Sequence, residues 1–194
     1  MPENPSLIQF LVNTNLMHRQ KAAQIAAAFA EKTILKGGYF LEEGKTSNEY
    51  YFLDSGFMRA FAHDVDGNDV TTSFYAPGQV VFEVSSFFNR TPSLENIRAL
   101  TDCIGCYITY DELNALFHSR EEFREFGRYI LVKGFAAYKA RMLSHIVSTA
   151  EERYTSLLKN NPEIFMHASL KYIASYLGIT DTSLSRIRKE FSKK

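Results

Sequence analysis

Cysteine is scarce in this sequence, and long apolar runs are missing from it. Two cysteines among 194 residues are too few for a disulfide framework. No apolar stretch approaches the ~20 residues that a membrane-spanning helix needs. The start, Met1-Pro2-Glu3-Asn4-Pro5, is not a basic segment followed by an apolar run, so no secretory signal is visible. We therefore expect a cytoplasmic location and no contact with a membrane.

Net charge is also lacking, which argues against a protein that binds nucleic acid over its whole surface. The 22 basic residues balance 22 acidic residues. From Asn161 onward, however, six Lys and Arg residues stand against three acids. This local excess matters more for phosphate binding than the balance of the whole chain. With 45% hydrophobic residues, the chain can bury a core as one large domain or two small ones.

The clearest positive signal is a pair of short helices around a glycine turn in residues 167–191. Gly178 supplies the backbone freedom that a sharp turn needs, and Thr180 or Asp181 can cap the helix that follows. Apolar residues at helical spacing form the inner face of the pair: Leu170, Ile173, Ala174, Leu177, Leu184 and Ile187. The pattern predicts a helix-turn-helix whose second helix suits a DNA major groove.

The outer face of this pair is polar and cationic, as contacts to phosphates and base edges require. The predicted DNA-binding residues are Lys171, Thr182, Ser183, Ser185, Arg186, Arg188 and Lys189, with Lys193 and Lys194 as further cations for the DNA backbone. Ser183, Ser185 and Arg186 are expected closest to base edges. Asp181 would repel phosphate, although it suits the helix dipole. The alternative is a basic terminus that is merely solvated.

From Lys32 to about Tyr110 the hydrophobic period is two, and turn signals interrupt it. Asp66-Gly67 between two alternating runs is a strong hairpin signal. The expected strands are 39–41, 50–53, 57–63, 70–75, 80–84, 96–99 and 103–109. Many short strands separated by Gly and Asp turns indicate a sandwich or a jelly-roll barrel.

Helical patterns flank these strands, over residues 6–30 and 111–159. In the second segment, apolar residues step by three and four from Phe123 to Ile146. An apolar stripe of this length favours packing against a second helix. The small residues Gly134, Ala136 and Ala137 would let the two helices approach closely. We expect a dimer seam here, although the stripe could instead cover the strands.

This order of elements resembles the CRP/FNR family of bacterial transcription regulators. The resemblance rests on Glu43-Gly44, Tyr51-Phe52-Leu53, Ser55-Gly56, Asp66-Gly67, Pro77-Gly78 and Glu83, and on the C-terminal motifs of Bacteroidetes-type members in residues 151–154, 172–180 and 184–189. It implies an α+β fold: a cyclic-nucleotide-binding-like jelly roll (1–118), a dimerisation helix (119–148) and a helix-turn-helix domain (149–194). It also implies a homodimer that binds a two-fold symmetric double-stranded DNA operator.

Two departures from the family pattern are visible. Members that bind cyclic AMP carry a Gly-Glu pair at the start of a short helix and then an Arg-Ser/Thr-Ala turn, which together neutralise the cyclic phosphate. Here Phe82-Glu83 replaces the first, and Arg90-Thr91-Pro92-Ser93-Leu94-Glu95 replaces the second. We therefore expect no response to cyclic AMP. In addition, Ser192-Lys193-Lys194 leaves no room for the family's β-wing.

Enzymatic and metal chemistry find little support in the sequence. Cys103 and Cys106 have metal-like spacing, but residues three apart on a strand point to opposite faces and cannot share an ion. We expect two buried structural thiols. The five histidines are dispersed, which argues against a metal-binding cupin, and Glu42-Glu43 is expected to be a solvated turn. The sequence thus predicts no enzyme, no cofactor and no metal.

An effector pocket inside the roll is one interpretation of its aromatic cluster, and ordinary core packing is the other. The pocket candidates are Phe74, Phe82, Glu83, Arg90 and Arg98. The leading hypothesis is a DNA-binding regulator with an unknown small-molecule effector, and RNA polymerase is a further partner that the resemblance suggests. The alternative is an effector-binding or protein-interaction roll whose helix-turn-helix no longer binds DNA.

Overall fold

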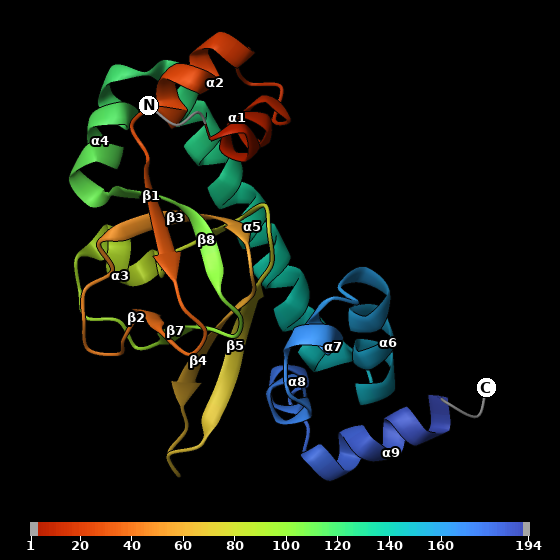
Figure 1. The fold of residues 1–194 in the computed structure, drawn as a ribbon. Helices are drawn as coiled ribbons and strands as arrows, with labels where there is room; N and C mark the ends of the chain where they lie inside the picture. The colour runs from red at the N-terminus through yellow and green to blue at the C-terminus, as the bar shows by residue number, and fades with distance from the viewer. Residues whose placement is uncertain (1–3, 192–194) are drawn as a thin grey trace.

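The computed structural model describes residues 4–191 of the chain (Figure 1). The predictions about the first three residues and about residues 192–194, including the missing wing and the roles of Lys193 and Lys194, lie outside the described part. Within residues 4–191, the helices and strands form a roll capped by helices, one long helix, and a smaller helical lobe at the C-terminal end. None of the helices described has the length and apolar character needed to span a bilayer.

The N-terminal helical segment is two helices rather than one. α1 (Pro5–Val12) begins at Asn4, whose side chain accepts a hydrogen bond from the Leu7 N–H at 2.9 Å, and α2 (Arg19–Ala26) follows a turn in which Asn15 is left-handed. β1 (Ala30–Ile34) then begins where the sequence predicted the end of a helix. The prediction missed this strand because Ala30-Glu31-Lys32 has no apolar alternation. The strand forms because it pairs with β8.

The roll consists, among the described residues, of two antiparallel sheets in the strand orders β1-β8-β3-β6 and β2-β7-β4-β5. The remaining strands are β2 (Tyr39–Leu41), β3 (Glu49–Ser55), β4 (Met58–His63), β5 (Asp69–Tyr75), β6 (Gln79–Val81), β7 (Asn96–Ala99) and β8 (Cys103–Thr109). Apolar side chains from both sheets fill the space between them, among them Tyr51, Leu53, Met58, Ile97 and Cys103. The predicted hairpin at Asp66-Gly67 joins β4 to β5. The jelly-roll prediction is therefore confirmed.

The strand expected over 80–84 is shorter than predicted, because a helix begins at Val84. α3 (Val84–Asn89) starts at Glu83, whose carboxylate accepts hydrogen bonds from the N–H groups of Ser85 and Ser86. A self-capped helix start satisfies amides that would otherwise lack partners. The capped start of α3 therefore fixes where β6 (Gln79–Val81) ends.

The helical segment predicted over 111–159 is three helices: α4 (Tyr110–Ser119), α5 (Glu121–Val147) and α6 (Ala150–Asn160). α4 and α6 each begin with a reciprocal capping box, formed by Thr109 with Glu112 and by Thr149 with Glu152. α5, at 27 residues, is the long helix. Phe123 and Phe126 at its start are buried in a core that α1, α2 and α4 share with the first sheet. The apolar stripe therefore divides into a buried start and an exposed remainder.

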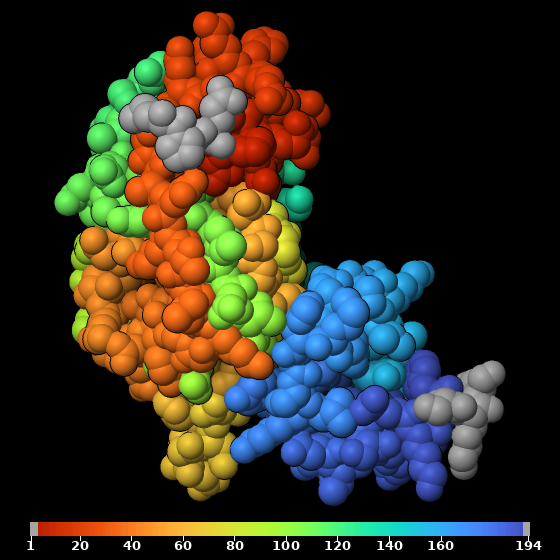
Figure 2. All heavy atoms as spheres, viewed as in Figure 1, coloured from red at the N-terminus to blue at the C-terminus, as the bar shows by residue number. Residues whose placement is uncertain are grey.

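The C-terminal lobe contains α6, α7 (Ile164–His167), α8 (Leu170–Leu177) and α9 (Asp181–Phe191). Its core includes Tyr154, Ile173, Leu184 and Ile187. One residue of the roll, Phe57, belongs to the same core. Figure 2 shows the lobe in blue projecting from the roll, with the β4–β5 hairpin in yellow reaching down beside it. The lobe and the roll are therefore in direct contact.

Candidate functional site

The predicted helix-turn-helix forms as α8, a tight turn and α9. Ser169 caps α8 by accepting a hydrogen bond from the Tyr172 N–H at 3.3 Å. Gly178 ends α8 in the left-handed conformation, with φ of 66°, and a Cβ there would lie 3.2 Å from Nδ1 of His145. Thr180 Oγ1 accepts from the Ser183 N–H at 3.2 Å. Of the two residues predicted to cap α9, Thr180 is therefore the one that accepts a hydrogen bond from an N–H group at the start of the helix.

The relative position of the two helices is fixed by complete burial of their facing side chains. Ile173 and Leu184 are fully buried, and Leu177 and Ile187 nearly so. Such a rigid pair can present the opposite face of α9 to a ligand without reorganising.

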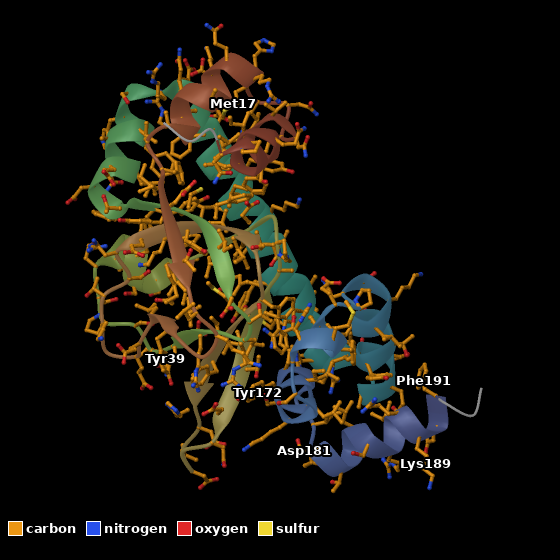
Figure 3. All side chains as sticks on the ribbon, viewed as in Figure 1. Met17, Tyr39, Tyr172, Asp181, Lys189 and Phe191 are labelled. Carbon is orange, nitrogen blue, oxygen red and sulfur yellow. The ribbon has the colours of Figure 1, made fainter. Side chains whose placement is uncertain are left out.

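The predicted DNA contacts lie on α9, apart from Lys171, which lies on α8. The exposed members of that set are Lys171, Thr182, Ser185, Arg186, Arg188 and Lys189, whereas Ser183 is half-buried and accepts a hydrogen bond from Thr180 Oγ1. Figure 3 places Lys189 near the end of α9, on the side of the molecule far from the N-terminal helices. Asp181 is exposed at the opposite end of the helix. The structure thus gathers this set on one small motif.

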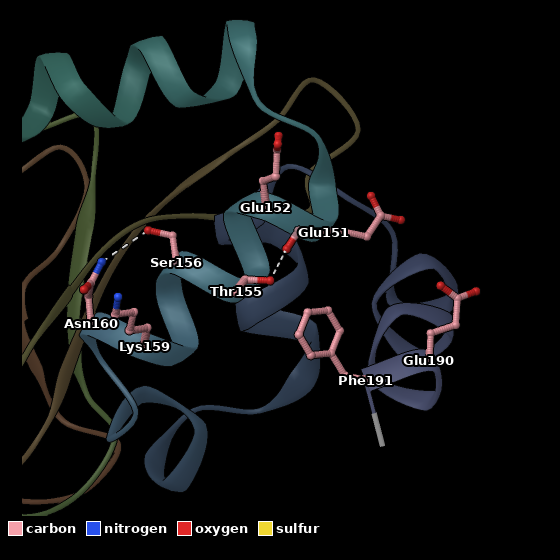
Figure 4. Close-up of a pocket in the computed structure, with 8 residues that line it drawn as sticks. All are labelled: Glu151, Glu152, Thr155, Ser156, Lys159, Asn160, Glu190 and Phe191. Carbon is pink, nitrogen blue, oxygen red and sulfur yellow. Dashed lines mark hydrogen bonds between the residues drawn. The ribbon is translucent and has the colours of Figure 1, made fainter. Parts of the chain in front are cut away.

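A groove that sequence reasoning missed lies between α6 and the end of α9. It has a volume of about 900 Å³ and is lined by Glu151, Glu152, Thr155, Ser156, Lys159, Asn160, Glu190 and Phe191 (Figure 4). Its polar groups are partly used within α6, since Thr155 donates to the Glu151 carbonyl at 2.7 Å and Asn160 donates to Ser156 Oγ at 3.2 Å. With three carboxylates against one lysine, this groove would repel phosphates.

The effector-pocket candidates do not form one site. Phe82 packs with Tyr50, Phe87 and Phe88 in the core, as the alternative interpretation expected. Phe74 points to the other side of the roll, where its ring lies 5.1 Å from that of Tyr176 in α8. Arg98 donates to the Gly37 carbonyl at 2.8 Å and stacks on Tyr39.

Glu83 and Arg90, at the two ends of α3, are both occupied by the protein itself. Glu83 binds the first amides of the helix, as described above. Arg90 donates to the carbonyl of Ser47 at 2.9 Å and to Asn48 Oδ1 at 2.8 Å, and its guanidinium lies over the Tyr110 ring. Glu95 is largely buried, and its pKa is raised. The main cause is burial of the carboxyl, and nearby charges have smaller effects.

Cys103 and Cys106 are both buried and unpaired, and they belong to different cores on opposite faces of β8. Burial raises the pKa of both thiols, that of Cys106 to about 12. Across residues 4–191, no three His, Cys, Asp or Glu side chains form a group that could hold a metal ion. Glu42 and Glu43 are exposed, as predicted, with Glu42 paired to Lys45 and Glu43 lying 2.8 Å from His63.

The middle and end of α5 carry an exposed apolar face. Its large side chains are Tyr129, Leu131, Val132, Phe135, Tyr138, Met142, Leu143, Ile146 and Val147. Phe135, Tyr138 and Ile146 are each about two-thirds exposed or more, at 69%, 66% and 72%. Contiguous apolar surface of this extent marks an interaction face in a protein.

Comparison with known proteins identifies residues 31–120 as a match to the cyclic nucleotide-binding domain family. The chain is 23% identical over 174 residues to an anaerobic regulatory protein of Haemophilus influenzae, covering 84% of this chain and 67% of that protein. It is 24% identical over 174 residues to a fumarate and nitrate reduction regulatory protein of Vibrio cholerae, covering 84% and 69%. These relatives are regulators rather than enzymes, as the sequence predicted.

Solved structures share the fold. FixK2 from Bradyrhizobium japonicum superposes with a TM-score of 0.74 at 19% identity, over 85% of each chain. A transcriptional regulator of the CRP/FNR family from Eubacterium rectale gives 0.71 at 12% identity, over 95% of this chain and 88% of the other. The matched domain, the relatives that span most of the sequence and the shared fold together make this chain similar to transcription regulators of the CRP/FNR type.

Proposed function

We propose that this protein regulates transcription by binding double-stranded DNA as a homodimer, through α9 of each subunit. The observation that carries the proposal is the exposed polar and cationic face of α9, held by a buried core. Thr182, Ser185 and Arg186 lie in the half of α9 that would approach base edges, and Lys171 and Lys189 would bind phosphates. A cytoplasmic location of the protein, as expected from the sequence, is consistent with this function.

The apolar face of α5 supports the homodimer. A second copy offers the same face, so two α5 helices can bury Phe135, Tyr138, Met142 and Ile146 against each other. The C-terminal lobe follows α5 directly in the chain, and a parallel helix pair would therefore carry two copies of α9 on one side. Two-fold operators require half-sites about 34 Å apart, one helical turn of DNA.

We further propose that cyclic AMP is not the effector. A cyclic phosphate needs free amides at the start of a short helix and a nearby arginine. Here the carboxylate of Glu83 already accepts from these amides, and Arg90 is bonded to Ser47 and Asn48. Glu95 adds a second acid near Glu83, whose negative charge contributes, after burial, to the raised pKa of Glu95. The proposed effector is a small molecule of other chemistry, and RNA polymerase is a further proposed partner.

The test is DNA binding measured against salt, on an operator selected from a random-sequence pool. Arg186→Ala with Arg188→Ala should weaken binding and lower the salt slope by about 2, roughly 0.9 for each phosphate that the protein no longer neutralises. The charge-matched control is Arg19→Ala with Lys36→Ala, both exposed and remote from α9. Unchanged affinity and slope in the α9 variant would favour the alternative, a roll whose helix-turn-helix does not bind DNA.

A further inference from the structure

The free edge of β5 is the place where the roll meets the helix-turn-helix. The pairing of β4 with β5 skips a residue, since Ala60 faces Ser73 and Phe61 faces Thr71, so Thr72 forms a bulge. Beside the bulge, the Thr71 N–H donates to Ser175 Oγ of α8 at 3.1 Å. Ser175 Oγ in turn donates to Thr71 Oγ1 at 2.9 Å. A serine of α8 therefore takes the position of a missing neighbouring strand.

The long helix takes part in the same contact. Nη1 of Arg141, on α5, donates to the carbonyl of Thr72, and Nη2 donates to the carbonyl of Tyr176 at 3.4 Å. The guanidinium also lies 4.0 Å from the centre of the Tyr176 ring. One arginine thus joins the roll, the helix that we propose to form the dimer, and the first helix of the helix-turn-helix.

A second arginine lies at the centre of the contact. Arg59 on β4 is only 2% exposed, and its guanidinium is sandwiched 4.0 Å from the Phe61 ring and 3.6 Å from the Tyr172 ring. It forms an ion pair with Asp69, while its Nη1 has no hydrogen-bond partner among the described residues. Tyr172 belongs to α8 and is visible beside the roll in Figure 3. The lobe therefore covers a charge that water would otherwise solvate.

This arrangement suits a contact that opens and closes. Burying a charged group with an unsatisfied donor is unfavourable, and departure of Tyr172 would let water reach Nη1 of Arg59. The stacking, the Ser175 hydrogen bonds and the Arg141 bridge act in the opposite direction. Opposing contributions at one interface allow two states of similar free energy.

We propose that Arg59, Thr71, Arg141, Tyr172 and Ser175 form a latch that sets the orientation of α9 relative to the roll and to α5. They are positioning residues: none lies on α9, and the latch holds the two α9 helices of a dimer at the spacing that DNA requires. The role in DNA binding rests on the proposed function above. The latch itself can be tested without DNA.

The first experiment measures the distance between spin labels at Val65→Cys in the hairpin and Ser156→Cys on α6. Both sites are exposed, and Cys103 and Cys106 are buried and stay unlabelled. Doubly labelled subunits are diluted with unlabelled ones, so that only distances within a subunit are observed. We expect one narrow distribution, which Tyr172→Leu and Ser175→Ala broaden or shift. Tyr172→Phe should restore it because the ring is kept.

The matched control is Tyr39→Leu. Tyr39 stacks on Arg98, which is the cross-strand partner of Arg59 and donates to the Gly37 carbonyl of the roll. Figure 3 shows Tyr39 on the roll, on the side away from the lobe. Thermal melting of each variant confirms that it is folded under the conditions of measurement. An unchanged distribution in folded Tyr172→Leu, or the same broadening in Tyr39→Leu, would overturn the latch.

The second experiment compares a single half-site with paired half-sites whose spacing is varied in steps of one base pair. Tyr172→Leu should bind the single half-site like wild type, lose about fivefold or more on the paired site, and discriminate less between spacings. Equal losses on both DNAs would show a damaged helix-turn-helix, and tighter paired binding would show an inhibitory contact; either result overturns the positioning role. Absence of DNA binding in the wild type would refute the proposed function and leave the spin-label result standing.

Discussion

At the scale of single residues, burial decides which groups can react. The thiol of Cys106, with a pKa of about 12, is almost entirely protonated at neutral pH, and the buried Cys103 has a raised pKa as well. We predict that a thiol reagent at pH 8 modifies neither cysteine in the folded protein and both after denaturation. Counting the reactive thiols in each state checks this, and rapid modification of the native protein would contradict it.

The sequence contained enough information to place these two cysteines, but not Arg59. Alternation along a strand sets Cys103 and Cys106 on opposite faces whatever the strand packs against. Arg59 lies in a similar alternating run, and there an arginine indicates a solvent-facing position. Its burial depends on Tyr172, far away in the sequence, and on Asp69 in the next strand. No local pattern reports such a contact.

At the scale of elements, the capping boxes make helix stability depend on pH. Hydrogen bonds from Thr109 to the Glu112 carboxylate lower its pKa from 4.5. The pKa of Glu112 is therefore lower in the folded protein than in the unfolded chain. The contribution of this cap to the free energy of unfolding is complete above about pH 4.5 and is lost as the pH falls through the folded-state pKa.

We predict that Thr109→Ala lowers the free energy of unfolding by ~1 kcal/mol at pH 7, a typical value for loss of a threonine cap. The difference between variant and wild type should narrow as the pH falls from 4.5 through the lowered pKa of Glu112 in the folded protein. Urea unfolding at pH 7 and at a series of acidic pH values measures it. A difference that stays constant with pH would show that Glu112 takes no part in the cap.

For α5, we predict that Phe135→Glu with Ile146→Glu converts a dimer to a monomer, because charges cannot be buried unpaired at a helix seam. Sedimentation equilibrium gives the mass. Val65→Glu is the control, since Val65 is fully exposed in the hairpin and far from α5's exposed face. A dimer that survives the double substitution would place the dimer contact elsewhere.

Element boundaries were predictable where local signals were strong, and not elsewhere. The turn at Gly178 and the hairpin at Asp66-Gly67 occur where glycine and capping residues predicted them. The continuous helical period from 111 to 159 concealed two breaks, at Arg120 and at Ser148, where the backbone becomes extended. Where the chain turns into the next helix depends on tertiary packing as well as on local caps, and hydrophobic period alone cannot detect this.

At the scale of the whole molecule, the occupied start of α3 predicts the response to ligand. A ligand that binds the native state with Kd 100-fold below its concentration would add about 2.7 kcal/mol to stability. We predict that 1 mM cyclic AMP, roughly 100-fold above a Kd of about 10 μM, leaves the melting temperature and operator affinity unchanged. A clear upward shift of the melting temperature would show that a phosphate displaces the Glu83 carboxylate from the N–H groups of Ser85 and Ser86.

The overall architecture followed from the order of sequence patterns, whereas the contact between its parts did not. Period two, then a long helical stripe, then a glycine-centred helix pair indicates roll, helix and helix-turn-helix. Nothing in those patterns shows that Ser175 would bind the edge of β5, or that Arg141 would bridge three elements. Both contacts are made by ordinary polar residues on helices.

The core shared around Phe57 has a consequence for how such a protein can be recombined. A cut after residue 148 would follow the expected boundary, yet it would uncover Phe57 and Phe74 together with the unpaired Thr71 N–H on an edge strand. An uncovered edge is a template for strand pairing between molecules. The isolated roll should therefore self-associate, and grafting a foreign output domain onto it would require a new cover for β5.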